Sequence, residues 1–352
     1  MTSPIILSVR PGSGALQAAL DRLPQDGTPA VIRLAPGVYR EKAVLARSHT
    51  TLEGASAGST RIVWGDGARE ILEDGMKRGT FRTATLRTDG AHITLRRLTI
   101  ENDASPREKA GQAIALYADG DHLLVEDCVL RSFQDTLFTA PLPPKEIEKN
   151  GFIGPKQHAP RVPQRHTYRR CRIEGDVDFI FGGAAAWFEG CDIVAVDGRG
   201  DRREPFTAFC TAASTPENQA YGYVFKGCRF LNGGCPPGSV YLGRPWREWA
   251  KTVLLDFELG DHIAPAGFDD WGKPLAHEIA FFAEYGCTGP GADGQRAPFV
   301  RQLTAKQAGA ITYEAFLSSM PERCAGKRPI RTTHDSKLPD ETSTVHRAAY
   351  FV

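Results

Sequence analysis

Acidic and amide side chains interrupt three apolar runs of the sequence, and these residues have the clearest capacity for chemistry. The runs are Gln-Ala-Ile-Ala-Leu at 112–116, Phe-Gln-Asp-Thr-Leu at 133–137 and Val-Asp-Phe-Ile-Phe-Gly at 177–182. A buried amide or carboxylate without a partner costs about 1–3 kcal/mol or more. An amide ladder or a turn cap remains an alternative role for Gln112. Asp178 stands inside the most apolar run, and a functional role explains it better.

Asp135 and Asp178 occupy equivalent places in the sequence. Asp135 lies seven residues after Cys128, and Asp178 lies seven residues after Cys171. If these segments form neighbouring coils of a stacked fold, equivalent positions lie about 4.8 Å apart. Two carboxyl groups so close cannot both ionise easily, so we expect their pKa values to separate. One would be a protonated acid, and the other a free carboxylate that serves as nucleophile or base.

Two amides and an arginine–tryptophan pair could complete a site for a sugar acid. Gln112 and Gln134 carry N–H groups, which suit a developing oxyanion. Arg244 and Trp246 lie in the segment Leu-Gly-Arg-Pro-Trp. A guanidinium group can hold a carboxylate through two hydrogen bonds, and an indole ring can stack on a sugar face. Because glycine and proline surround this pair, we expect a fixed turn.

A six-residue repeat indicates the elements that position these side chains. Six copies carry apolar residues at positions one, four and six, and the residues at position four are Leu98, Cys128, Cys171, Cys191, Cys228 and Phe257. The last three positions alternate like a half-buried strand. The copies are 20–43 residues apart, and such a period is typical of stacked units. We therefore predict an all-β parallel β-helix, with inward cysteines stacked as small apolar side chains.

Helices are expected at both ends of this solenoid. The segment 14–23, with Ser13 as its N-cap, places apolar residues on one face and would cover the open end. Two short helices are expected over 304–310 and 312–320, after the strand pattern ends.

The chain is interpreted as a single domain over 1–324, followed by a polar tail over 325–352 that has no period. Residues 140–164 form a proline-rich insertion in one coil. Long loops on solenoids often line the binding face, so we expect this loop beside the substrate.

Composition excludes several classes of partner. The 352 residues carry 43 basic and 42 acidic side chains, a formal net charge of +1, which does not favour nucleic acid or an anionic membrane. The longest apolar run, 179–188, is far shorter than the ~20 residues of a membrane helix.

The nine histidines form no cluster with ligand spacing, so neither a metal nor a cofactor is expected. The eight cysteines contain no CxxC and no leader is visible, so we expect free thiols and a cytoplasmic protein.

With these segments, the sequence resembles the pectin methylesterases, the pectinesterase family of carbohydrate esterases. Five segments match in the family's order, and they are 37–41, 112–116, 134–137, 178–182 and 242–246. The resemblance as a whole covers residues from about 10 to 320. The resemblance implies a right-handed parallel β-helix, in agreement with the repeat. It also implies hydrolysis of the methyl esters of galacturonate units, in pectin or in oligogalacturonides. The long loop resembles that of bacterial members.

The resemblance implies a role for each matching residue. Asp178 would attack the ester carbonyl, and Asp135 would protonate methanol and later activate water. Gln112 and Gln134 would steady the oxyanion, and Arg244 would orient Asp178 and keep it ionised. Three apolar side chains would line the sugar subsites: Trp246, Phe181 and Val177.

Three other functions remain as alternatives. An acyl-thioesterase on the same fold would need an apolar acyl channel in place of Arg244 and Trp246. A pectate- or polygalacturonate-cleaving enzyme that inverts would need carboxyl groups about 6.5–9.5 Å apart. A sugar-binding module would not need the acid pair. Most relatives are exported, but this sequence shows no leader, so we expect an enzyme that acts inside the cell on short methylated oligomers. We also expect a monomer.

Overall fold

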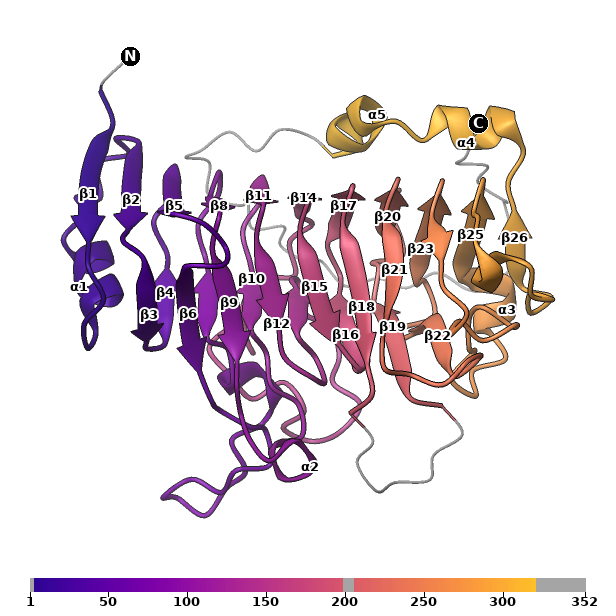
Figure 1. Ribbon diagram of the computed structural model, residues 1–352, viewed down its shortest axis with the longest axis horizontal. Helices are drawn as coiled ribbons and strands as arrows, with labels where there is room; N and C mark the ends of the chain where they lie inside the picture. The colour runs from indigo at the N-terminus through magenta and orange to yellow at the C-terminus, as the bar shows by residue number, and fades with distance from the viewer. Residues whose placement is uncertain (1–2, 199–205, 321–352) are drawn as a thin grey trace, which may run out of the picture.

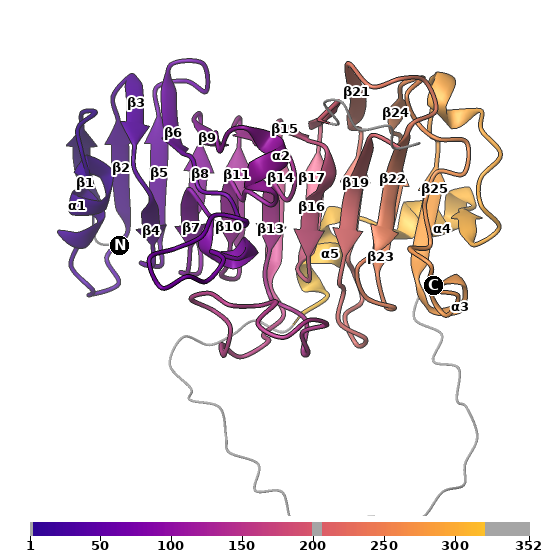
Figure 2. The ribbon, with the colours of Figure 1, turned by 90° about the horizontal axis from the view of Figure 1, so that it is seen from below.

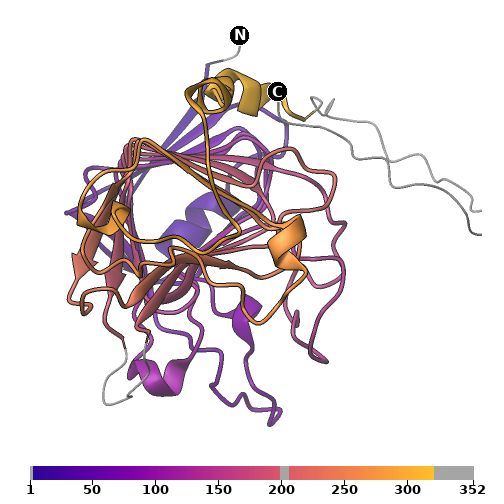
Figure 3. The ribbon, with the colours of Figure 1, turned by 90° about the vertical axis from the view of Figure 1, so that its right-hand side faces the viewer.

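Three sheets of parallel strands wind around one elongated core in the computed structural model, which describes residues 3–198 and 206–320. From β2 to β24, successive strands enter the first, second and third sheet in turn, so each circuit of the chain forms one coil of a right-handed parallel β-helix (Figures 1 and 3). The predicted fold class is confirmed. Within the described residues no helix is long and apolar enough to cross a membrane.

The first sheet has eleven strands: β1 Ile5–Val9, β2 Ala30–Leu34, β5 Thr50–Gly54, β8 Thr94–Arg96, β11 Leu123–Glu126, β14 Arg165–Arg169, β17 Ala185–Glu189, β20 Tyr223–Lys226, β23 Lys251–Leu255, β25 Phe281–Tyr285 and β26 Val300–Gln302. The second has eight: β3 Gly37–Arg40, β6 Thr60–Trp64, β9 Thr99–Asn102, β12 Val129–Arg131, β15 Arg172–Gly175, β18 Asp192–Val196, β21 Arg229–Gly233 and β24 Glu258–Leu259. The third has seven: β4 Ala43–Leu45, β7 Leu86–Thr88, β10 Leu116–Ala118, β13 Leu137–Thr139, β16 Val177–Gly182, β19 Ala208–Ala213 and β22 Val240–Pro245.

The six-residue repeat forms the corner between the first and second sheets. Its third residue has a left-handed backbone in every copy, with φ between 49° and 60° at Arg97, Asp127, Arg170, Gly190, Gly227 and Asp256. The position is polar or glycine because the chain turns outward there, and an apolar β-branched side chain would be strained. The fourth residue then turns inward. The strands that follow stay in register, with Val129 opposite Arg172 and Arg172 opposite Asp192.

The predicted cysteine stack lies inside the core next to this corner. Cys128, Cys171, Cys191 and Cys228 are buried and are not in disulfides. The backbone N–H of Cys191 donates to the Sγ atom of Cys228 at 3.3 Å, across neighbouring coils. These thiols fill the core as small apolar groups.

Helix α1 (Ala15–Asp21) covers the first coil, but its N-terminus differs from the prediction. The N-cap is Gly14, with φ 64° and no side-chain cap, so the assignment to Ser13 is wrong. The buried carboxylate of Glu41 takes that role instead and accepts the N–H groups of Leu16 and Gln17, both at 3.0 Å. An acceptor distant in sequence cannot be found from local capping rules.

The two predicted C-terminal helices are present, and a threonine caps each of them. Thr304 caps α4 (Ala305–Ala310) and Thr312 caps α5 (Tyr313–Ser318). Both helices lie along the outer face of the first sheet, where Phe316 packs with Trp187 (Figure 1). Short helices α2 (Arg107–Ala110), α3 (Ala276–Ile279), η1 (Thr80–Arg82) and η2 (Pro290–Ala292) lie in the connecting loops. The predicted domain end at 324 and the tail 325–352 lie outside the described residues.

Candidate active site

Asp135 and Asp178 lie on neighbouring coils at the third sheet. Strand β13 pairs with β16 so that Leu137 faces Ile180, which puts the two aspartates, each two residues earlier, at equivalent positions. The N–H of Asp135 donates to the carbonyl of Val177 at 3.0 Å. Each of the two residues is 7% exposed, and both line the same cleft. Figure 2 shows this face of the molecule, with β13, β16, β19 and β22 side by side.

A left-handed backbone directs both aspartates outward. The φ angle is 66° at Asp135 and 51° at Asp178. Asp178 lies within β16, and the pairing of β16 with β19 shifts register between Val177 and Ile180. This irregularity puts Asp178 in the cleft while Phe179 and Ile180 enter the core. Non-glycine residues rarely adopt this conformation, and it is typical of functional positions.

Different surroundings separate the two carboxyl groups. Burial raises the pKa of Asp135 well above its ordinary value, and the charge of Asp178 adds to that rise. Burial also raises the pKa of Asp178, but the hydrogen bonds and charge of Arg244 oppose the effect. Asp135 is therefore the group that holds a proton, and Asp178 is the carboxylate.

Arg244 holds Asp178 with both arms of its guanidinium group. Its Nε and Nη2 atoms donate to Oδ1 and Oδ2 of Asp178, each at 2.8 Å. The two faces of the guanidinium lie 3.9 Å from the ring centre of Phe209 and 3.8 Å from that of Trp271. Gly243 allows this approach, because a Cβ atom there would lie 1.9 Å from Oγ1 of Thr211.

Gln112 and Gln134 line the cleft beside the acid pair. Their backbone carbonyls accept hydrogen bonds from Ala68 at 2.9 Å and Ala113 at 3.0 Å, which fixes their place on successive coils. Within the part of the chain that the structure describes, neither side-chain amide has a hydrogen-bond partner in the protein. Both amides are therefore available to an oxyanion.

The cleft has a volume of about 810 Å³ and an aromatic wall. The ring centres of Phe181 and Trp246 are 5.7 Å apart, and Phe152 lies 6.1 Å from Trp246. Val177, expected beside the sugar, is half-buried and does not line the cleft. Val177 pairs with Phe209, whose ring lies against Arg244, so Val177 faces the outside of the third sheet without reaching the cleft.

Two loops that enter and leave the third sheet form the rim of the cleft. One is part of the predicted long loop, residues 147–153, and the other runs from Ala68 to Phe81. Neither the second loop nor the two aromatic side chains around Arg244, which are Phe209 and Trp271, could be predicted from the sequence. No spacing links these residues to the motifs, although Asp-Asp-Trp at 269–271 is a polar turn that ends in an indole.

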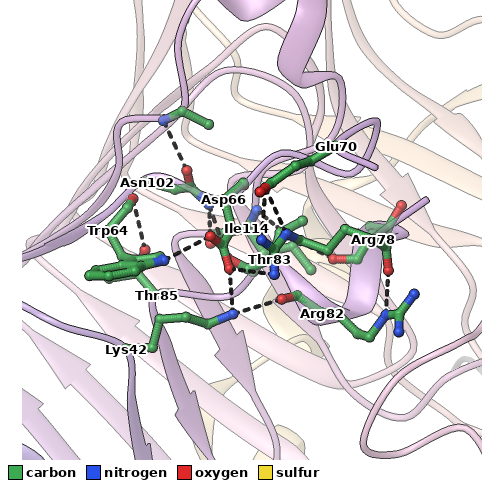
Figure 4. A network of polar contacts seen from close by, with 12 residues as sticks. Lys42, Trp64, Asp66, Glu70, Arg78, Arg82, Thr83, Thr85, Asn102 and Ile114 are labelled. Carbon is green, nitrogen blue, oxygen red and sulfur yellow. Dashed lines mark hydrogen bonds and ion pairs between the residues drawn. The ribbon is translucent and has the colours of Figure 1, made fainter. Parts of the chain in front are cut away.

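A buried ion-pair network holds the second loop in place (Figure 4). Asp66 accepts Nζ of Lys42 at 2.6 Å, Nη1 of Arg78 at 3.0 Å and Nε1 of Trp64 at 2.8 Å. The buried amide of Asn102 donates to three carbonyls, those of Asp66, Thr83 and Ile114. Since Ile114 is two residues from Gln112, the network connects the cleft wall to the oxyanion side of the site.

No group of three or more His, Cys, Asp or Glu side chains within 3–198 and 206–320 is arranged to hold a metal ion. The acid pair, its arginine and the two amides are polar groups of the cleft.

Comparison with known proteins gives matches along most of the chain. The family model described as Pectinesterase matches residues 10–142 and 160–319. Pectinesterase QRT1 of Arabidopsis thaliana is 31% identical over 300 residues, which are 83% of this chain and 70% of that protein. Pectinesterase 31 of the same plant is 30% identical over 324 residues, or 89% of this chain and 92% of that protein.

Solved structures agree with these matches. A pectin methylesterase in complex with a hexasaccharide has a TM-score of 0.73 and 27% identity, covering 92% of this chain and 100% of that one. Pectin methylesterase PemA from Erwinia chrysanthemi has a TM-score of 0.72 and 27% identity, covering 91% and 99%. Because the family match runs through nearly the whole β-helix and includes the strands that carry Asp178 and Arg244, this chain belongs to the pectinesterase family.

Proposed function

We propose that this protein hydrolyses methyl-esterified galacturonate units of pectin or oligogalacturonides, with Asp178 as nucleophile and Asp135 as general acid and base. One observation carries the proposal: two nearly buried carboxyl groups lie at equivalent positions of neighbouring coils, and a bidentate arginine holds only Asp178. Burial and the charge of Asp178 raise the pKa of Asp135, which favours a proton on Asp135. The arrangement provides a nucleophile, a proton donor and free amide donors within one cleft.

The first half-reaction releases methanol. A carboxylate oxygen of Asp178 bonds to the ester carbonyl carbon, and the carbonyl electron pair moves onto its oxygen, where Gln112 and Gln134 donate N–H groups. When this intermediate collapses, the bond to the methoxy oxygen breaks. That oxygen takes the proton of Asp135 and leaves as methanol. An acyl anhydride on Asp178 and an ionised Asp135 remain.

The second half-reaction regenerates the enzyme. Asp135, now a carboxylate, takes a proton from water while the water oxygen bonds to the acyl carbon. The bond between that carbon and the Asp178 oxygen then breaks, which restores the Asp178 carboxylate and the protonated Asp135. The galacturonic acid product loses its proton to solvent.

Separate assays of methanol and of new reducing ends on esterified oligogalacturonides test this function. We expect methanol without reducing ends, whereas a chain-cleaving enzyme would produce reducing ends. Asp178→Ala should lower kcat by about 10³-fold or more. The control is Asp192→Ala, which removes only an exposed ion pair with Arg229 and should retain full activity. Unchanged methanol release by Asp178→Ala would refute the assignment.

We also propose that the enzyme is a cytoplasmic monomer of bacterial type that acts on short oligomers. Unbridged Cys128, Cys171, Cys191 and Cys228 are compatible with a reducing compartment, and a single chain supplies every group of the site. The family match omits residues 143–159, part of the long loop at the rim, so this part of the loop departs from the family pattern. Cell fractionation, light scattering and methanol release against oligomer length test these points.

A further inference from the structure

The loop 269–273 packs on the catalytic arginine from the side opposite Phe209. Its anchor is Lys273, whose Nζ donates to the carbonyls of Pro245 at 2.6 Å and Trp246 at 3.1 Å. Both carbonyls directly follow Arg244 in β22 and the turn after it. Asp269 adds one backbone bond, from its N–H to the carbonyl of Gly243 at 3.0 Å.

Between these anchors the Trp271 ring lies against two cations. The Cζ atom of Arg244 is 3.8 Å from its ring centre, and Nζ of Lys273 is 4.4 Å from it. Trp271 has a left-handed backbone with φ 55°, and its N–H donates to Oδ1 of Asp269 at 2.7 Å. A non-glycine residue in this conformation needs support from its surroundings, and the contact of Lys273 with the ring contributes to it.

The other face of Arg244 lies on Phe209, so the two rings clamp a guanidinium group whose hydrogen bonds, among the described residues, go to Asp178. If Trp271 moves away, the planar fork loses one of its two stacking partners. The direction of the Asp178 carboxylate then depends on a less constrained side chain.

We infer that Lys273 is a positioning residue, which holds Trp271 against Arg244 and thereby fixes the orientation of the nucleophile Asp178. The inference rests on the proposed function for its catalytic consequence. Lys273 itself lies outside the set of residues that line the cleft.

Lys273 loses its charge at a lower pH than an ordinary lysine. Burial lowers its pKa to about 8, and the charges of Arg247 and Arg244 contribute, whereas Glu248 and Asp178 oppose the shift. The other charged groups near the loop are Asp269, Asp270 and the His277 ring bonded to Asp270. As pH rises through this value, the ammonium loses its charge, so its contact with Trp271 and its bonds to the two carbonyls weaken.

Stability and activity should then respond in opposite directions. A lysine with a lowered pKa is less favourable as a cation in the folded protein than in the unfolded chain. This group therefore raises the free energy of unfolding as pH rises from about 8 toward 10.5. A purely structural role predicts no catalytic loss in that range, whereas a positioning role predicts a fall in kcat.

The test compares Lys273→Met and Lys273→Arg in the full chain, with kcat and KM for methanol release measured from pH 6 to 10. Lys273→Met keeps most of the stem without the charge. We expect its kcat to fall about tenfold at pH 7, with an unchanged melting temperature and no further decline near pH 8. Lys273→Arg should keep most of the activity, and its alkaline decline should move above pH 8 because arginine stays charged. Lys251→Met is the matched control, since Lys251 is also partly buried and donates to the carbonyls of Gln219 and Ala220, away from the cleft.

A second readout is independent of activity. The tryptophan fluorescence that Trp271→Phe removes should titrate near pH 8 in the unmodified protein and not in Lys273→Met. The inference would be overturned if Lys273→Met kept both the alkaline decline in kcat and the fluorescence titration of the parent. Methanol release by the parent protein would still leave the proposed function intact. Absence of methanol release by the parent would overturn the proposed function, and fluorescence alone would then decide the role of Lys273.

Discussion

At the scale of residues, the site depends on two aspartates that the fold holds in an unfavourable backbone and an unfavourable environment. Both have left-handed φ angles, and both are nearly buried. Proteins retain such costs where they serve function, so replacement can improve stability while it removes activity.

Asp135→Asn should show this exchange directly. Because the folded protein raises the pKa of Asp135, the unfolded chain gives up this proton more readily. The free energy of unfolding therefore falls as pH rises from 3.8 toward the raised value. Asparagine removes that penalty, so the variant should melt at a higher temperature than the parent at pH 7, with a difference that shrinks toward pH 4. Its kcat should fall by about 10²–10⁴-fold.

Thermal melts and methanol assays at matched pH values measure both effects. Asp192→Asn, on the exposed surface of the second sheet, should change neither. A variant that is less stable than the parent at pH 7 and equally active would contradict the assignment of the proton to Asp135.

The sequence was sufficient to place Asp135 and Asp178 on neighbouring coils, because both follow the repeat by the same number of residues. It could not reveal their left-handed backbones, since the register shift in β16 arises from pairing with β19. It also could not reveal Phe209, Trp271 or Lys273. Their contacts with Arg244 join segments that carry no common spacing.

At the scale of elements, the strands and short helices followed from local patterns, whereas the loops did not. Helices α4 and α5 lie within the predicted spans, 304–310 and 312–320. The loop from Ala68 to Phe81 gave no sequence signal, because Asp66 joins its Arg78 to Lys42 and Asn102 on two other segments.

Asp66→Asn should loosen this loop while the β-helix stays folded. The variant loses the attraction of Lys42 and Arg78 for a carboxylate that is nearly buried. We expect faster tryptic cleavage at Lys77 and Arg78. A loss of about 1 kcal/mol in substrate binding would raise KM about fivefold with little change in kcat.

The matched control for the loop is Asp74→Asn. Asp74 is exposed in the same loop, and its Oδ1 accepts only the N–H of Met76 among the described residues. It should leave KM and proteolysis unchanged. Equal KM values for Asp66→Asn and the parent would show that the network does not support the substrate wall.

At the scale of the whole molecule, one buried arginine connects the C-terminal helices to the solenoid. Arg165 lies in β14, binds Asp121, and donates from Nη1 to the carbonyls of Leu317 at 2.8 Å and Met320 at 3.1 Å. Its side chain is almost fully buried. The link spans more than 150 positions of sequence, which explains why no local pattern predicts it.

Arg165→Met should lower the free energy of unfolding by about 3–5 kcal/mol, because it leaves Asp121 as a buried charge without its partner arginine. Denaturant titration measures the loss. Arg229→Met, which removes an exposed pair with Asp192, should cost no more than about 1 kcal/mol. Because α5 lies on the first sheet and the site on the third, kcat at 25 °C should stay at the parental value. Equal losses for both variants would contradict the anchoring role.

The two-residue corner between the first and second sheets also limits how such a chain can diversify. From β8 onward this corner leaves no room for added length, since the next residue must already turn inward. Insertions can be accommodated where the chain enters or leaves the third sheet, as in the long segments around 66–83 and 140–164. New specificities should therefore be engineered by inserting peptide in these loops, while the corner between the first and second sheets is left unchanged.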